Sequence, residues 1–129
     1  MVLLVVMPKV VEMDESISIF SQMDEDVIPV ILINKFNVNP SEWDEFVKAW
    51  AEEAEKFKGQ PGFISSQLHR GIGGSGIFIN YAVWESTAEF KNAVNKVMNP
   101  HDRMSKYPPS TVASPHLFKK VAVAGVCVD

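Results

Sequence analysis

Two helix-start signals, each lying between strand-like segments, constrain the fold of this chain more than any other feature. The first is formed by Asn39, Pro40 and Glu42, which supply a capping residue, a proline at the first helical position and a glutamate three residues after the cap. The second is the capping box of Ser86 and Glu89. Runs rich in β-branched and aromatic residues stand before and after both signals. The sequence therefore predicts the order strand, helix, strand, strand, helix, strand.

Turn and breaker residues mark the ends of these elements. The expected strands span 27–38, 63–70, 76–85 and 116–128, and the expected helices follow the two start signals and end before Gly59 and Asn99. The βαββαβ order is typical of the ferredoxin-like fold of the α+β class, in which an antiparallel sheet carries both helices on one face. Residues 1–26 precede this pattern as an N-terminal extension, whose run Val2–Met7 is expected to add a strand to a sheet edge. Residues 27–129 form the predicted domain.

The first strand is apolar on both of its faces. Ile31 and Ile33 alternate with Leu32 and Phe36, and the third strand shows the same pattern. Two helices can cover only one face of the sheet, so a second subunit is expected to cover the other. The sequence thus predicts a homodimer.

Composition excludes several classes of protein. The longest apolar run, Val121–Val128, is eight residues long, which is too short to span a membrane. The single Cys127 rules out an internal disulfide framework, and the histidines show no metal-ligand spacing, so no bound metal is expected. The net charge is −4 and the only adjacent basic pair is Lys119–Lys120, which disfavours nucleic acid as a partner. The N-terminal run lacks the basic residues of a signal peptide, so the expected compartment is the cytoplasm.

Four short motifs carry a resemblance to a known family. They are Gln60–Phe63, Leu68–Arg70, Ala82–Ser86 and Pro115–Phe118, in this order on successive elements. Together they resemble the antibiotic biosynthesis monooxygenase (ABM) family over about residues 27–122. This resemblance implies a dimeric α+β barrel, in which the sheets of two ferredoxin-like subunits pack face to face. Members of the family include cofactor-independent oxygenases of polycyclic phenols or anthrones, haem-degrading enzymes and proteins without an assigned reaction.

Asn34 is the most informative single residue. Its amide lies within the apolar run VILINKF and is costly to bury without hydrogen-bond partners. Haem-degrading members of the family have an asparagine at this place that reaches the ligand, and Asn34 matches it. Those members also use a tryptophan in the second helix, where this chain has Ala93, and a histidine near the position of His101. A structural amide with satisfied hydrogen bonds is the alternative for Asn34.

The resemblance implies an oxygenase with a small aromatic (phenolic or anthrone-like) substrate, O₂ as co-substrate and no cofactor. The candidate catalytic residues are Asn34 as hydrogen-bond donor, His101 as base and Tyr81 as an orienting hydroxyl. The candidate pocket residues are Phe46, Trp50, Phe78 and Phe90. The helical spacing of the aromatic residues equally fits a core stripe, with acidic residues such as Glu53 on the solvated face. Two further functions stay open: a non-catalytic small-molecule-binding or stress-associated dimer, and a haem-binding or haem-degrading monooxygenase.

Overall fold

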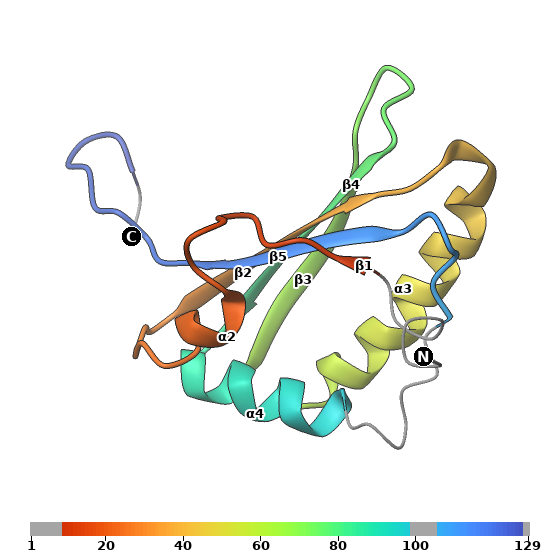
Figure 1. The fold of residues 1–129 in the computed structure, drawn as a ribbon. Coiled ribbons are helices and arrows are strands. Elements are labelled where there is room, and N and C mark those ends of the chain that lie inside the picture. The colour runs from red at the N-terminus through yellow and green to blue at the C-terminus, as the bar shows by residue number, and fades with distance from the viewer. Residues whose placement is uncertain (1–8, 99–105, 128–129) are drawn as a thin grey trace.

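The computed structural model describes residues 9–98 and 106–127 and shows a five-stranded sheet with helices packed on one side (Figure 1). The strands are β1 (Lys9–Val10), β2 (Val30–Asn37), β3 (Phe63–Arg70), β4 (Ile77–Trp84) and β5 (Val112–Phe118). Their order across the sheet is β1-β5-β2-β4-β3, and β1 runs parallel to β5 whereas all other neighbours are antiparallel. The four long strands confirm the predicted ferredoxin-like α+β fold. The short β1 makes the sheet mixed, and the sheet is not closed.

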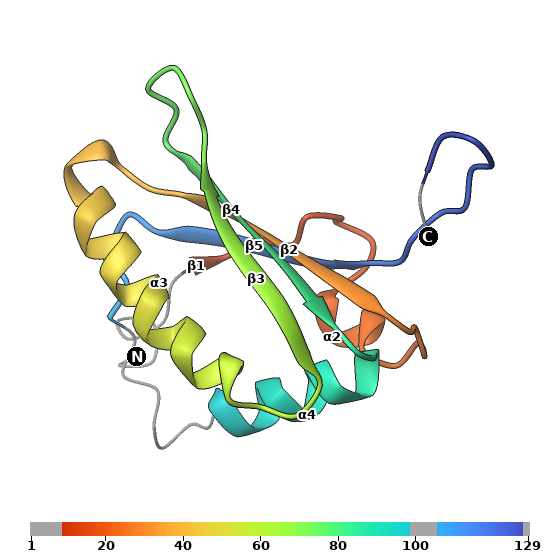
Figure 2. The ribbon, with the colours of Figure 1, turned by 180° about the vertical axis from the view of Figure 1, so that it is seen from behind.

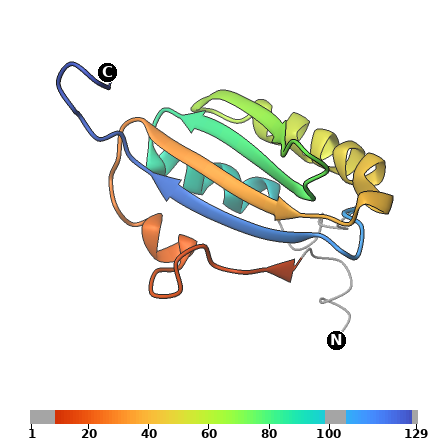
Figure 3. The same cartoon turned by 90° about the horizontal axis from the view of Figure 1, so that it is seen from above.

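Two long helices, α3 (Trp43–Lys58) and α4 (Thr87–Val97), cover one face of the sheet. When the molecule is seen from above, the sheet lies in front of both, and the near face carries no helix (Figure 3). Ser86 caps α4 as expected, because its Oγ accepts a hydrogen bond from the backbone N–H of Glu89 at 3.1 Å. No helix in the described parts of the chain is long and apolar enough to cross a membrane.

The start of α3 differs from the predicted capping box. Asn39 makes no side-chain capping bond, and a 3₁₀ turn, η1 (Pro40–Glu42), leads into the helix. The carboxylate of Glu42 accepts instead from the backbone N–H of Ser110 at 3.1 Å, while the Ser110 hydroxyl accepts from the N–H of Asn39 at 3.0 Å. The helix-start residues therefore also fix the segment that enters β5.

Side chains between the sheet and the helices form two clusters. The Trp84 cluster contains Ile19, Met23, Val30, Ala82, Trp84, Phe90, Ala93 and Leu117. The Phe46 cluster contains Phe36, Val38, Phe46, Phe78 and Ala113. In the second cluster the ring of Phe46 lies 4.9 Å from that of Phe36 and 4.7 Å from that of Phe78, measured between centroids. The helix-facing side of the sheet is therefore packed tightly at two separate places.

The last strand lies earlier in the chain than the predicted 116–128. β5 ends at Phe118, and residues 119–127 are exposed and lead away from the sheet (Figure 3). β5 includes Pro115, although proline cannot donate to a β-ladder. Its nitrogen, however, faces away from β2, on the same side as the backbone N–H of Leu117, which bonds to the side chain of Gln22. The missing N–H therefore removes no bond between β5 and β2.

Residues 9–26 pack along the outer edge of β5. β1 pairs with the first two residues of β5, and the one-turn helix α2 (Ile19–Gln22) contacts its far end (Figure 1). The Gln22 amide donates from Nε2 to the carbonyl of Leu117 at 3.0 Å and accepts at Oε1 from the N–H of Leu117 at 2.9 Å. We call this pair of bonds the Gln22 clip. The predicted strand Val2–Met7 lies outside the described residues.

The sheet face opposite α3 and α4 carries partly exposed apolar side chains among polar ones such as Lys35, Gln67 and His116. It carries Ile33 of β2, Tyr81 of β4, which is 41% exposed, and Phe118 of β5, which is 36% exposed. Figure 2 shows from behind that α3 and α4 lie on one side of the strands. The apolar side chains expected on this face are therefore present, but polar residues lie between them.

Candidate functional site

Two asparagines lie side by side on the helix-facing side of the sheet. Asn34 of β2 is paired directly with Asn80 of β4. Two residues before Asn34, Leu32 packs against the Trp84 cluster, and two residues after it, Phe36 belongs to the Phe46 cluster. Along β4, Ala82 belongs to the Trp84 cluster and Phe78 to the Phe46 cluster. The Asn34–Asn80 amide pair therefore forms the polar boundary between the two apolar clusters.

The carbonyl oxygens of both amides are buried without partners. Neither the Oδ1 of Asn34 nor that of Asn80 is solvent-exposed, and neither accepts a hydrogen bond from any residue that the structure describes. A buried polar group left in this way costs about 1–3 kcal/mol. Thr111 and His116 each have one such atom as well, but they are not paired with each other in the sheet. Two adjacent orphaned acceptors are a feature that a bound ligand would satisfy.

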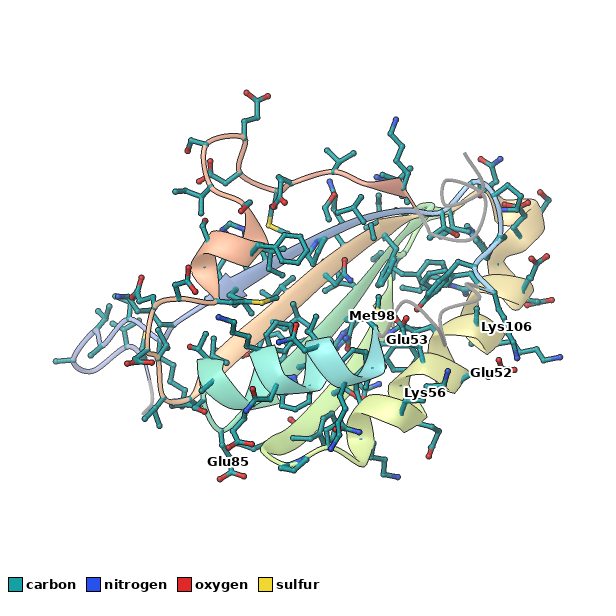
Figure 4. The ribbon with its side chains drawn as sticks, turned by 60° about the horizontal axis from the view of Figure 1, so that its bottom comes forward. Glu52, Glu53, Lys56, Glu85, Met98 and Lys106 are labelled. Atoms are coloured by element: carbon teal, nitrogen blue, oxygen red, sulfur yellow. The ribbon has the colours of Figure 1, made fainter. Side chains whose placement is uncertain are left out.

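A second polar pair lies beyond the Phe46 cluster. The hydroxyl of Tyr107 donates to Oε1 of Glu53 at 2.9 Å, and the Tyr107 ring stacks on Phe36 with a centroid separation of 6.1 Å. Figure 4 shows Glu53 on the side of α3 that is turned toward Met98, at the end of α4. Burial raises the pKa of the Glu53 carboxyl, and the bond from Tyr107 opposes that rise only in part. Burial and the nearby Glu53 raise the pKa of Tyr107 as well.

Glu53 is not on the solvated face to which the helical period assigned it. Its carboxylate accepts a hydrogen bond from Tyr107, which lies 54 residues further along the chain. Its neighbour Glu52 does lie on the surface and forms an exposed ion pair with Lys106 at 2.9 Å. No local signal in the sequence separates these two glutamates.

The predicted catalytic residues do not all come together. Asn34 lies in the amide pair, and His101 lies outside the described residues. Tyr81 lies on the opposite face of the sheet from Asn34, because it follows Asn80 directly and successive side chains of a strand alternate between faces. The structure therefore does not bring the Tyr81 hydroxyl to Asn34.

The predicted pocket aromatics are core residues that flank the amide pair on its two sides. Phe46 and Phe78 belong to the Phe46 cluster, and the half-buried Trp50 packs against it. Phe90 belongs to the Trp84 cluster, with its ring 5.7 Å from that of Trp84. Asn80 is the residue that sequence reasoning missed. Within the described ranges, no three His, Cys, Asp or Glu side chains are grouped so that they could hold a metal ion.

The fold and the two buried amide oxygens together define a small ferredoxin-like α+β protein with a polar site between two apolar clusters. A sequence model of the antibiotic biosynthesis monooxygenase family matches residues 29–98, which is more than half of the chain. The chain belongs to this family. No functionally curated protein matches the sequence.

Solved structures of similar proteins include both oxygenases and haem-degrading proteins. SnoaB, a cofactor-independent oxygenase from Streptomyces nogalater, is 23% identical with a TM-score of 0.62, over 77% of this chain and 99% of that chain. A MhuD mutant with two manganese protoporphyrin IX bound per active site is 27% identical with a TM-score of 0.60, over 74% and 98%. A haem-degrading protein from Mycobacterium tuberculosis is 26% identical with a TM-score of 0.56, over 76% and 100%. The shared architecture thus supports more than one chemistry.

Proposed function

We propose that this protein is an ABM-type monooxygenase that acts on a small, flat aromatic molecule of the phenol or anthrone class and needs no bound cofactor. The observation that carries the proposal is the buried, unpartnered side-chain oxygen of Asn34, which lies between the Trp84 cluster and the Phe46 cluster and shows that this amide has an unmet hydrogen-bonding need. Aromatic side chains favour a flat aromatic ligand, and the amide offers a hydrogen bond to its oxygen substituent. The fold and the family membership agree with this assignment.

The proposed chemistry uses the substrate itself as the source of electrons. A base removes a proton from the substrate carbon, and the resulting enolate passes electrons to O₂ and forms a carbon–oxygen bond with it. Breakdown of the peroxide leaves one oxygen atom on the substrate as a carbonyl and releases the other as water. The Asn34 amide, turned so that its NH₂ faces the substrate, stabilises the enolate oxygen. His101 is the proposed base, because an imidazole exchanges protons near neutral pH.

We also propose that two copies associate through the sheet face opposite α3 and α4. The support is the exposed apolar surface around Tyr81 and Phe118, which no helix of the described chain covers. Sedimentation at micromolar concentration tests this, and a mass corresponding to a single chain would contradict it.

Haem is the competing ligand, and the likeness to MhuD is the observation that favours it. The described residues fit it poorly. His69 and His116 both lie on the sheet face opposite the amide pair, so neither can offer an imidazole to an iron on the helix-facing side. We therefore derive no step through haem. Titration of the protein with haem, followed at the Soret band, tests this alternative directly.

Oxygen consumption with dithranol and 1-naphthol tests the proposed function. We expect the protein to accelerate O₂ uptake above the uncatalysed rate and Asn34→Ala to lower kcat by about 10²-fold, as for other single donors to an oxyanion. Asn37→Ala is the matched control, because Asn37 is exposed at the end of the same strand. Binding of these compounds without O₂ uptake would favour the non-catalytic alternative, and a lack of binding would refute the proposal.

A further inference from the structure

We propose that Glu53 is a further catalytic residue, which carries a proton from the substrate carbon to the departing hydroxide when the peroxide breaks down. This inference rests on the proposed function and adds to it the group that completes the reaction. It starts from the observation that the hydroxyl of Tyr107 holds this carboxyl on the inner side of α3, with a hydrogen bond of 2.9 Å.

Glu53 lies on α3 between the two residues through which this helix contacts the two clusters. Trp50, before it, packs against the Phe46 cluster, and Phe57, after it, packs against the Trp84 cluster. On the sheet, the amide pair lies between the same two clusters. Glu53 and the amide pair therefore mark the same boundary, one from the helix and the other from the sheet.

The bond to Tyr107 fixes the direction of the Glu53 side chain. The ring of Tyr107 stacks on that of Phe36, whose side chain faces the helices, while its hydroxyl donates to Oε1 of Glu53. The carboxyl therefore points into the layer between α3 and the sheet. Figure 4 shows Glu53 on the side of α3 that faces Met98, so the end of α4 closes the same layer.

The proposed reaction has a step that needs a proton carrier at this place. After O₂ has bonded to the substrate carbon and the peroxide has taken up the first proton, that carbon still carries one hydrogen. The Glu53 carboxylate removes this hydrogen as a proton, the electron pair of the C–H bond forms the second bond of the carbonyl, and the O–O bond breaks to release hydroxide. Glu53 then gives the proton to the hydroxide, which leaves as water. The carbon is oxidised, the peroxide is reduced, and the carboxylate is regenerated.

The charged groups around Glu53 support a role in which it first accepts and then donates a proton. Burial raises the pKa of its carboxyl and brings that pKa closer to neutral pH, where a carboxyl is a better proton carrier. The hydrogen bond from Tyr107 and the charge of Lys56, on the same helix, oppose this rise only in part. The exposed ion pair of Glu52 and Lys106 lies at the surface. Tyr107 is therefore a positioning residue that also lowers the pKa of Glu53.

The experiment separates O₂ uptake from carbonyl formation in a single turnover of dithranol, with the protein in excess. An oxygen electrode follows the uptake, and chromatography after an acid quench follows the hydroperoxide and the carbonyl product. For Glu53→Gln we expect O₂ uptake to stay nearly unchanged, carbonyl formation to slow by about 10²-fold, and the hydroperoxide to accumulate. Glu52→Gln is the matched control on the exposed side of the same helix and should leave both rates unchanged.

Tyr107→Phe provides a measurement that a purely structural role would not change. In the wild-type protein, carbonyl formation from the hydroperoxide should slow on acidification, because Glu53 must be ionised to take the proton. Loss of the Tyr107 hydroxyl removes a bond that lowers the pKa of Glu53, so this slowing should begin at a higher pH in the variant. Glu53→Gln should not show this pH dependence.

Carbonyl formation that keeps pace with O₂ uptake in Glu53→Gln, or an equal loss of both rates, would overturn the role of Glu53 while leaving the proposed function standing. An unchanged pH dependence in Tyr107→Phe would overturn it as well. If the wild-type protein does not accelerate O₂ uptake, the proposed function fails and this inference fails with it. Glu53→Met, of similar length and without charge, replaces Glu53→Gln in all arms if the glutamine variant does not fold.

Discussion

Removal of the Gln22 clip should destabilise the protein although Gln22 lies outside the predicted ferredoxin-like domain. In the wild-type protein its side chain acts as a short substitute for a neighbouring strand, since it satisfies both the N–H and the C=O of Leu117. Its Nε2 also lies 3.2 Å from Nε2 of His116. Gln22→Ala removes all of these contacts at once.

The expected loss follows from what is left unpaired. Leu117 is buried, and a buried backbone group without a partner costs about 1–3 kcal/mol. Because Gln22 itself is only half-buried, water can replace part of what is lost. We therefore expect Gln22→Ala to lower the free energy of unfolding by about 2–3 kcal/mol. Gln22→Glu should be similar at pH 7, where a carboxylate oxygen faces the Leu117 carbonyl, and should recover at acidic pH as that carboxyl regains a proton to donate.

Urea unfolding at constant protein concentration measures these differences as shifts of the midpoint. Gln67→Ala is the control, because Gln67 is an exposed glutamine on β3, the opposite edge strand, and should change stability by less than about 0.5 kcal/mol. If Gln22→Ala is no more destabilising than this control, water replaces the clip and the reasoning is wrong.

Three further predictions concern Glu53, Gly62 and Phe46. Glu53→Gln should stabilise the protein at pH 7 but not near pH 4, as measured by urea unfolding across pH. Because the pKa of Glu53 is raised in the native state, the native protein keeps this proton to a higher pH than the unfolded chain does, and the stability of the wild-type protein falls as pH rises above the ordinary carboxyl range. The amide of the variant does not ionise and would still accept the hydrogen bond from Tyr107. Gly62→Ala should lower the melting temperature, because φ is +87° and the new Cβ would lie 2.4 Å from the Cβ of Glu89. Phe46→Ala should cost about 3–5 kcal/mol by denaturant unfolding, because this ring is fully buried between two others.

The parts of the fold that local chemistry determines were predictable from the sequence. Ser86 starts α4 as expected because its capping bond reaches only three residues ahead. The start of β5 was misplaced because the strand includes Pro115, and proline fits there only because its nitrogen faces the outer edge of the strand. That information depends on Gln22, which lies far away in sequence, and no local pattern contains it.

The candidate site was half predictable for a similar reason. Asn34 was singled out because an amide interrupts an apolar run, and Asn80 interrupts the run IFINYAV in the same way. What the sequence lacks is the register that makes the two residues partners. Tyr81 was included for its hydroxyl, but its position one residue after Asn80 sends its side chain to the other face.

The contact between the N-terminal segment and β5 also has a consequence for the order of folding. Gln22 and Leu117 are separated by 95 residues, so the segment that leaves the ribosome early has no partner until nearly the whole chain has been made. Closing so long a loop is entropically costly and is repaid only when β5 is already in place. We therefore expect this edge to close after the folding transition state. Loss of the clip should then accelerate unfolding in stopped-flow measurements and leave the folding rate nearly unchanged.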